Sequence, residues 1–184
     1  MVTDPELEKR MAQDDFAGLG QMVQSLMRLP QGLCKTRGNC CRVVTYKGSL
    51  GVEDIAELAQ SDSEQSENAR DFLTLFEPYA HQEDAREIAP LFVEQVRQTV
   101  PEEKQAEISF FRCRFLGDTG LCRIWEDRPT GCRMYPFPHE KTIYHPGCGF
   151  AKAGQENWEK IQTIVNFFER RQSELKAQSQ QLHQ

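Results

Sequence analysis

The sequence predicts a mainly α-helical fold with short β or extended segments, organised as a small single domain around an irregular, cysteine-rich core. The length of 184 residues suits one domain. Apolar residues recur at helical spacing in several segments, as at Trp158, Ile161 and Ile164. Residues 43–46 and 108–111 are rich in β-branched or aromatic residues, which favour extended chain. The cysteines lie mostly in segments that glycine and proline make irregular.

The first helix is expected to begin at Pro5, because proline suits the first helical position. Thr3 or Asp4 can cap it, since their side-chain oxygens accept from backbone N–H groups of the first turn. Gly18 and Gly20 are expected to weaken or divide this helix, because glycine has low helix propensity.

Three more helices are expected in the first two thirds of the chain. Ser49 can cap a short helix over residues 52–59. A second helix, through residues 72–76, should stop before the next proline. A third carries residues 88–96, with Pro90 near its start or at a kink.

This order of segments predicts three regions. Residues 1–30 form an N-terminal helical segment, and residues 31–152 form a cysteine-cluster domain with intervening helices. Residues 153–184 form a C-terminal amphipathic helix and a polar tail. The last helix should begin near Gly154 and fray beyond Leu175, where the sequence becomes polar.

Charge and hydropathy limit the kinds of partner. The formal net charge is −6, so we expect neither nucleic acid nor an anionic membrane as a partner. No run approaches the roughly 18 apolar residues of a membrane helix. The acidic first residues lack the apolar core of a signal peptide. We therefore expect a soluble, cytoplasmic protein.

The seven cysteines are the candidate metal ligands, because their odd number and a reducing compartment argue against a disulfide framework. They are Cys34, Cys40, Cys41, Cys113, Cys122, Cys132 and Cys148. Thiolates bind zinc and also hold iron–sulfur clusters, so both cofactors are candidates. The spacings C-x5-C-C, C-x8-C-x9-C and C-x15-C match neither common zinc fingers nor bacterial ferredoxins. The fold must therefore bring the sulfurs together.

Three local features refine this prediction. An extended chain would direct Cys40 and Cys41 to opposite sides, which suits two neighbouring metal sites or a polynuclear centre; alternatively, one sulfur binds metal and the other packs in the core. A hairpin-like turn at residues 117–120 would let Cys113 and Cys122 face each other. His145 is either an additional ligand or a loop histidine held by a hydrogen bond.

Arginines lie beside three of the later cysteines: Arg112, Arg114, Arg123 and Arg133. A nearby guanidinium group makes a thiol easier to ionise. These side chains could therefore offset the negative charge of a thiolate cluster, or they could form surface ion pairs.

Residues 122–136, CRIWEDRPTGCRMYP, resemble the signature of the YkgJ-type cysteine-cluster family of zinc- or iron-chelating domain proteins. The segment from Cys34 to Cys41 is similar to the family's C-x2-C-x2-C-C motif, with Arg37 in place of the second cysteine. The resemblance covers residues 34–148 and implies that all seven cysteines bind metal. Because of Arg37, one site could have an open position, recruit His145, or be lost.

Arg128, Pro129 and Arg133 are expected to support the ligands rather than to bind metal. The proline would fix the turn into Cys132, and Arg128 could donate to loop carbonyls or pair with a neighbouring carboxylate. Outer contacts of this kind orient metal ligands.

The favoured function is that of an iron–sulfur or zinc/iron protein acting in electron transfer or metal handling. The first alternative is a structural zinc module that contacts a protein partner. The second is a metal-dependent modifying enzyme of a methylase-like kind, because some members of the resembled family are associated with lysine methylation of flagellin. The sequence has no glycine-rich nucleotide loop and no hydrolase nucleophile motif.

Overall fold

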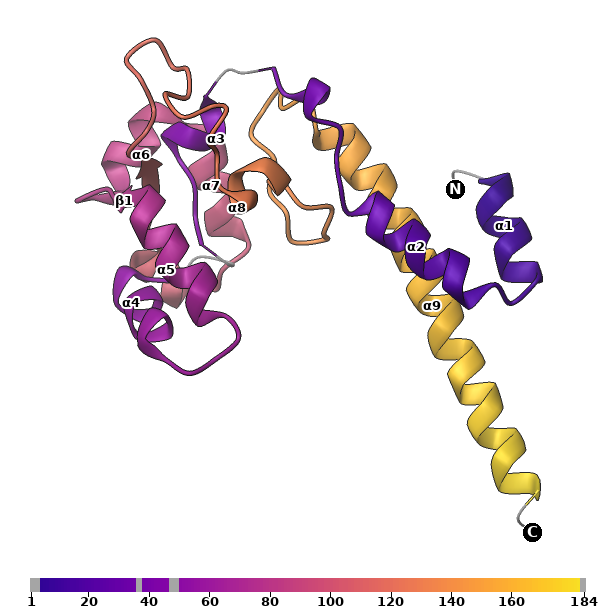
Figure 1. The fold of residues 1–184 in the computed structure, drawn as a ribbon. Helices are drawn as coiled ribbons and strands as arrows, with labels where there is room; N and C mark the ends of the chain where they lie inside the picture. The colour runs from indigo at the N-terminus through magenta and orange to yellow at the C-terminus, as the bar shows by residue number, and fades with distance from the viewer. Residues whose placement is uncertain (1–3, 36–37, 47–49, 183–184) are drawn as a thin grey trace. The chain divides into compact units, whose positions relative to one another are not determined.

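The computed structural model describes residues 4–35, 38–46 and 50–182 (Figure 1). It is mainly helical with one small sheet, as predicted. The chain forms two compact units. We call residues 1–33, 130–142 and 149–184 the helical unit, and residues 34–129 and 143–148 the cysteine unit.

The helical unit is built on one long helix. Its elements are α1 (Pro5–Ala12), α2 (Phe16–Leu26), the 3₁₀ turn η1 (Gln31–Leu33), α8 (Thr130–Met134) and α9 (Ala151–Leu182). Helix α2 lies along α9 (Figure 1). Ile164 and Phe167 of α9 pack with Leu7 and Leu19 in a buried cluster. The apolar stripe expected on the last helix is therefore the face that holds this unit together.

The break between the first two helices lies at residues 13–15, and the expectation of a break at Gly18 and Gly20 is wrong. Both glycines lie inside α2. Asp14 has a φ of 51°, a left-handed conformation that aspartate tolerates better than most residues. Asp15 then caps α2, because its carboxylate accepts from the Gly18 N–H at 2.9 Å.

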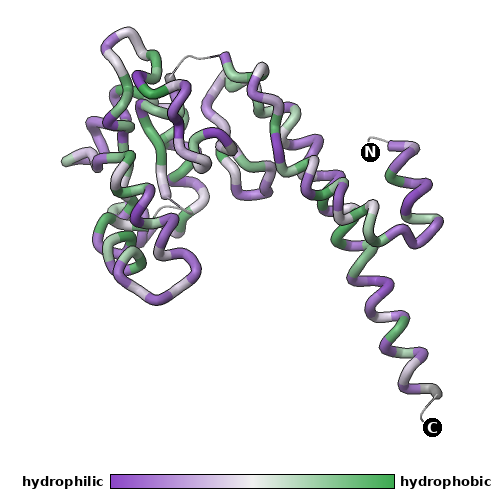
Figure 2. Tube along the Cα trace, in the orientation of Figure 1, coloured by the Kyte–Doolittle hydropathy of each residue, from purple (hydrophilic) through white to green (hydrophobic). Residues whose placement is uncertain are grey.

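The ends of the helical unit confirm one expectation and correct another. Asp4 caps α1, accepting from the N–H groups of Glu6 and Leu7 at 3.2 Å. Helix α9 continues to Leu182, beyond the point where fraying was expected. Its C-terminal part is mostly hydrophilic (Figure 2). Leu175 is 62% exposed, so this part of the helix gains little from apolar packing.

The cysteine unit consists of short elements. They are α3 (Asn39–Arg42), α4 (Val52–Gln60), α5 (Ser66–Leu75), β1 (Phe76–Pro78), α6 (Gln82–Ile88), α7 (Pro90–Gln98), the 3₁₀ segment η2 (Glu102–Glu107) and β2 (Phe111–Cys113). Pro90 is the first residue of α7, as expected. Gly51 precedes α4, and its N–H donates to Asp54 at 3.0 Å. The predicted cap Ser49 lies outside the described residues.

A short antiparallel sheet organises the cysteine unit. Strand β1 pairs with β2 so that Phe76 lies opposite Cys113. On the other side of β2, Val44 and Phe111 exchange two backbone hydrogen bonds of 2.9 Å. The Phe111 side chain is fully buried, and its ring meets Phe72 edge-on at 4.9 Å between centroids. Buried packing thus fixes the strand that ends at Cys113.

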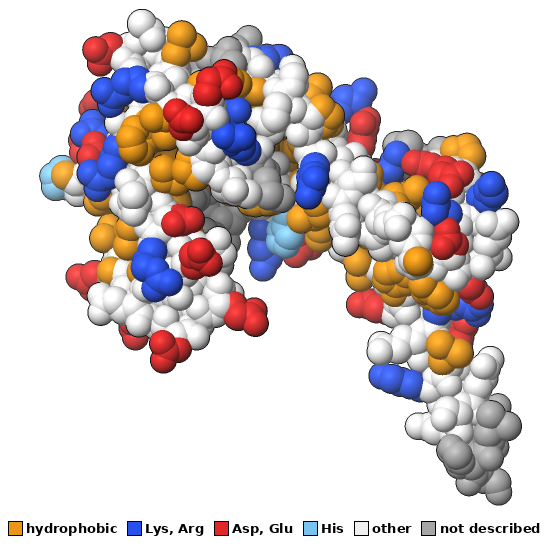
Figure 3. Space-filling model, viewed as in Figure 1, with side chains coloured by type: hydrophobic (Ala, Val, Ile, Leu, Met, Phe, Trp, Pro, Cys, Tyr) orange, Lys and Arg blue, Asp and Glu red, His pale blue; other side chains and the backbone are white. Residues whose placement is uncertain are grey.

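The surface carries no dominant charge of one sign on the face shown in Figure 3. Lysine and arginine side chains lie among aspartates and glutamates there. Among the described residues, no helix is both long and apolar enough to cross a bilayer.

Candidate metal centre

All seven cysteines lie in described segments, and all are thiols rather than disulfides. Six of them belong to the cysteine unit: Cys34, Cys40, Cys41, Cys113, Cys122 and Cys148. Cys132 lies on α8 in the helical unit. The fold thus gathers most of the predicted ligands in one compact unit.

Helix α3 presents Cys40 and Cys41 together. The expectation of extended chain here is wrong, because the two residues occupy a single helical turn. Neighbouring side chains on a helix are about 100° apart, not on opposite sides. The two thiols are consequently close enough to hydrogen-bond to each other.

Gly38 makes this placement possible. It precedes α3 with a φ of 66°, and a Cβ atom there would collide with the carbonyl oxygen of Gly120. A residue with a side chain would therefore separate α3 from the turn at residues 117–120. That turn is hairpin-like, as predicted. The Gly117 N–H donates to Leu121 O at 2.9 Å, and Leu116 bridges to Cys122.

Each cysteine of the α3 pair has its own set of neighbouring cysteines. Cys41 hydrogen-bonds to Cys113 and interacts electrostatically with Cys122. Cys40 interacts electrostatically with Cys34 and Cys148. We call Cys34, Cys40 and Cys148 the Cys40 group, and Cys41, Cys113 and Cys122 the Cys41 group. The hydrogen bond between Cys40 and Cys41 joins the two groups.

The thiols strongly affect one another's protonation. The hydrogen bond from Cys41 lowers the pKa of Cys40. The bond with Cys113 lowers the pKa of Cys41, but the bond with Cys40 and burial outweigh it and raise that pKa to about 12. The bond with Cys41, followed by burial, raises the pKa of Cys113. Several adjacent thiolates thus require a nearby cation, and a metal would bind by displacing their protons.

The donor chemistry of the two groups fits a soft or borderline metal. Sulfur ligands suit zinc and iron–sulfur centres. Within the segments that the structure describes, no three cysteine, histidine or acidic side chains already enclose a position for a single ion. The thiols instead form a hydrogen-bonded row through Cys40, Cys41 and Cys113.

Comparison with protein-family models identifies the domain that contains these cysteines. The CxxCxxCC model, described as a "putative zinc- or iron-chelating domain", matches residues 33–149. The chain belongs to the CxxCxxCC family. Among the curated proteins and the solved structures, none matches the chain. Family membership confirms the resemblance found in the sequence and supports metal binding by this domain.

One position of the CxxCxxCC motif differs in this chain. Arg37 stands where the second cysteine would be, and it lies outside the described residues. The motif therefore supplies Cys34, Cys40 and Cys41 only, and Cys113, Cys122 and Cys148 complete the two groups from segments far along the chain.

The arginines beside the cysteines are engaged with other groups. Arg112 and Arg114 pair with Glu77, at 2.6 and 3.3 Å. Arg123 donates to the Arg114 carbonyl at 2.6 Å. These arginines were expected either to offset the charge of a thiolate cluster or to form surface ion pairs. For Arg112 and Arg114, the structure shows ion pairs.

The predicted supporting residues belong to different units: Arg128 and Pro129 to the cysteine unit, and Arg133 to the helical unit. Arg128 donates to the Trp125 carbonyl at 3.0 Å and lies 3.6 Å above the Trp125 ring, so it does bond a loop carbonyl as expected. Pro129 is the last residue before α8. The Arg133 carbonyl accepts from Gln31 at 2.6 Å within the helical unit. Their support of metal ligands stays a prediction.

His145 is held by the protein itself. Its Nε2 donates to the Val43 carbonyl at 2.8 Å, and its ring stacks on Phe92 at 3.9 Å between centroids. Burial lowers the pKa of His145, and the hydrogen bond offsets part of that shift. His145 was expected to be either a metal ligand or a loop histidine held by a hydrogen bond, and the structure shows that hydrogen bond. A role as an additional ligand stays a prediction.

Sequence reasoning missed Tyr144. Its hydroxyl is buried and has no hydrogen-bond partner among the described residues. The available signal was its position four residues before Cys148, on the segment that contributes the last cysteine.

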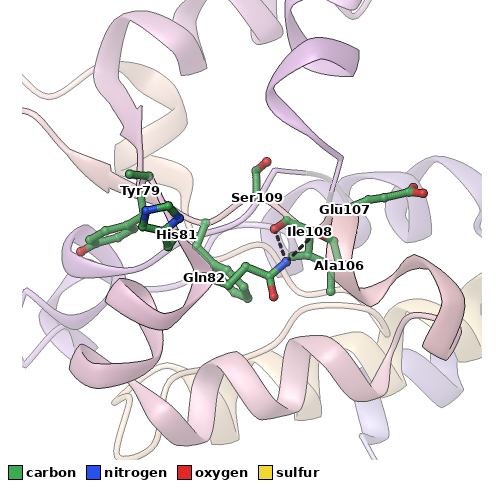
Figure 4. A pocket seen from close by; sticks show the side chains of 9 residues that line it. Tyr79, His81, Gln82, Ala106, Glu107, Ile108 and Ser109 are labelled. Atoms are coloured by element: carbon green, nitrogen blue, oxygen red, sulfur yellow. Dashed lines mark hydrogen bonds between the residues drawn. The ribbon is translucent and has the colours of Figure 1, made fainter.

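The cysteine unit also has a surface pocket of about 300 Å³ (Figure 4). It lies between the start of α6 and residues 106–110, which include the end of η2, and none of its lining residues is a cysteine. Gln82 fastens these two segments, because its amide donates to three backbone carbonyls, of Gln105, Ala106 and Ile108, at 2.8–3.1 Å. The pocket is thus formed by different residues from the metal centre.

Proposed function

We propose that this CxxCxxCC protein binds a polynuclear iron–sulfur or zinc/iron centre through its cysteines and acts in electron transfer or metal handling. The main support is the helical turn α3, which contributes one sulfur to each of two three-cysteine groups. Because Cys40 and Cys41 are adjacent, metals bound by the two groups would be neighbours.

The number of donors favours a joined centre over two separate structural zinc sites. A closed zinc site needs four protein ligands, whereas each group supplies three cysteines. Bridging sulfur atoms of an iron–sulfur cluster, or a thiolate shared between metals, would complete the coordination without additional side chains. Cys132 and His145 stay candidates for additional donors.

The proposal is tested by purifying the full chain without oxygen and measuring iron, zinc, acid-labile sulfide and the visible spectrum. We expect a coloured protein that contains iron. Cys40→Ser and Cys41→Ser should each lower the metal content, because each variant removes one sulfur from a different group. Asn39→Ala is the matched control, since it alters the same helical turn and keeps every cysteine.

The other outcomes are equally informative. A colourless protein with stoichiometric zinc would contradict electron transfer and favour the structural zinc module. A wild-type protein that binds neither metal, even after reconstitution, would refute the proposal. Cys132→Ser in the same series measures whether the cysteine of α8 also binds metal.

A further inference from the structure

Cys148 reaches the cysteine unit in a short excursion of the chain. Residues 143–148 belong to the cysteine unit, whereas the segments on both sides, 130–142 and 149–184, belong to the helical unit. Among the described residues, no backbone hydrogen bond joins residues 143–148 to the rest of the cysteine unit. Backbone pairing therefore does not fix where Cys148 lies, and side chains of the same segment must do so.

A tight turn connects Cys148 to His145. The Cys148 N–H donates to the His145 carbonyl at 2.9 Å, and Pro146 and Gly147 lie between them. Gly147 has a φ of 73°. A type II turn requires such a positive φ at its third residue and often has proline at its second. The turn is thus short and stiff, so a contact that fixes His145 also restricts the position of Cys148.

His145 is itself fixed by a hydrogen bond and a ring contact. Its Nε2 atom donates to the Val43 carbonyl at 2.8 Å, and its ring stacks on Phe92 of α7 at 3.9 Å between centroids. The side chain is 6% exposed. Ile143 also packs against the cluster that contains Val43 and Phe92, but apolar packing is not directional. The hydrogen bond is therefore the contact that sets the orientation of this segment.

Val43 is the residue at which α3 ends. Its N–H donates at 3.2 Å to the first residue of that helical turn, which carries Cys40 and Cys41. Val43 is fully buried, and a buried carbonyl needs a hydrogen-bond donor. His145 supplies that donor. This single contact therefore joins the turn of Cys148 to the end of the helix that carries the cysteine pair.

We infer that His145 is a positioning residue, which holds the turn of Cys148 against the end of α3 and so places this cysteine beside the α3 pair. The inference rests on the proposed metal centre, in which Cys148 is a ligand. Contacts that orient a metal ligand commonly change metal affinity by about 10–100-fold. His145 thus acts on the metal through Cys148, while its Nε2 proton stays on the Val43 carbonyl.

The test uses the full-length chain and separates the placement of Cys148 from metal binding. Dibromobimane bridges pairs of neighbouring thiols in the metal-free protein, and peptide mass mapping identifies which cysteines are bridged. Zinc affinity is then measured by competition with a chelator.

Three variants are compared with the wild type. His145→Phe keeps an aromatic ring and removes the hydrogen bond. Gly147→Ala keeps His145 but strains the turn, because a φ of 73° disfavours a residue with a side chain. His81→Phe is the matched control, since His81 is an exposed histidine of the same unit.

In the wild type, we expect dibromobimane to bridge Cys148 to a cysteine of α3. His145→Phe and Gly147→Ala should lose most of this bridge, keep the bridges within the Cys41 group, and bind zinc about 10–100-fold more weakly. His81→Phe should match the wild type in both measurements.

Three results would overturn the inference while leaving the proposed function intact. The first is a wild type in which Cys148 is not bridged to α3. The second is a His145→Phe variant that keeps this bridge; if it also binds zinc more weakly, His145 is a ligand instead. The third is equal loss of the bridges within the Cys41 group in both variants, which would assign His145 a role in general stability only.

Failure of the proposed function gives a different result. A wild type that binds neither zinc nor iron contradicts the metal centre itself, whereas the thiol bridges of the metal-free chain still report where Cys148 lies.

Discussion

The helical unit and the cysteine unit are stabilised in different ways. In the helical unit, the 32-residue α9 presents an apolar face as far as Phe168, and Ile164 is fully buried on it. Among the described residues of the cysteine unit, the longest helix has 10 residues, and the candidate ligands Cys40 and Cys41 lie on a helix of only 4. Isolated helices this short are unstable in water. The contrast indicates that the cysteine unit depends on tertiary contacts for its order, whereas helix periodicity accounts for much of the helical unit. We expect bound metal to add to the order of the cysteine unit.

Removing the metal should produce the largest difference between the units. Apparent binding free energies of structural zinc reach about 10–16 kcal/mol, and that energy is coupled to folding. After chelation, amides of α3 and of residues 113–122 should lose hydrogen-exchange protection, while those of α9 around Ile164 should retain it. Mass-spectrometric hydrogen exchange, with and without metal, measures this.

Reloading with metal is the control, because it should restore protection of the same amides. Equal loss of protection in both units would contradict the comparison. Unchanged protection in the cysteine unit would show that side-chain packing alone, without metal, keeps this unit folded.

Truncating one buried side chain in each unit should separate stability from metal retention. Phe111→Ala should cost about 3–5 kcal/mol and Ile164→Ala about 2–5 kcal/mol, because both side chains are fully buried. Only Phe111 lies on the strand that ends at Cys113. Phe111→Ala should therefore also lower the metal content. Urea unfolding and metal analysis of the two variants test this, and equal metal loss from both would contradict it.

The elements with strong periodicity or turn chemistry could be predicted from the sequence. Examples are the last helix, Pro90 at the start of a helix, and the turn between Cys113 and Cys122. The break at Asp14 could not be predicted in the same way, because competing helix weakeners, Gly18 and Gly20, follow it closely.

The candidate site was predictable in composition but not in arrangement. The cysteines themselves are evident in the sequence, whereas the division into Cys40 and Cys41 groups depends on tertiary contacts. The helical turn at Cys40 and Cys41 depends on Gly38, whose close approach to Gly120 brings together segments far apart in the chain. Local propensity contains no information about such a contact. Tyr144 was missed for a similar reason, since only the fold shows that its hydroxyl is buried.

The smallest expected effect concerns α1, where Asp4 both caps the helix and pairs with Lys160 at 2.7 Å. Asp4→Ala should cost about 0.5–2 kcal/mol of unfolding free energy. The hydrogen bond from Lys160, followed by that from the Leu7 N–H, lowers the pKa of Asp4 below its usual 3.8. The unfolded chain thus binds the proton at higher pH than the folded chain does. The contribution of Asp4 is complete above the unfolded pKa and is lost as pH falls through the folded pKa.

Urea unfolding of the wild type and of Asp4→Ala, repeated from pH 7 to acid, should therefore show a difference that shrinks below about pH 4. Lys160→Met is the matched control, because it removes the ion pair and leaves the cap. It should cost less than Asp4→Ala at neutral pH. A difference that does not change with pH would contradict the linkage. Metal content at neutral pH should be the same in all three proteins, since both contacts belong to the helical unit. Metal loss from Asp4→Ala would show that the two units are energetically coupled.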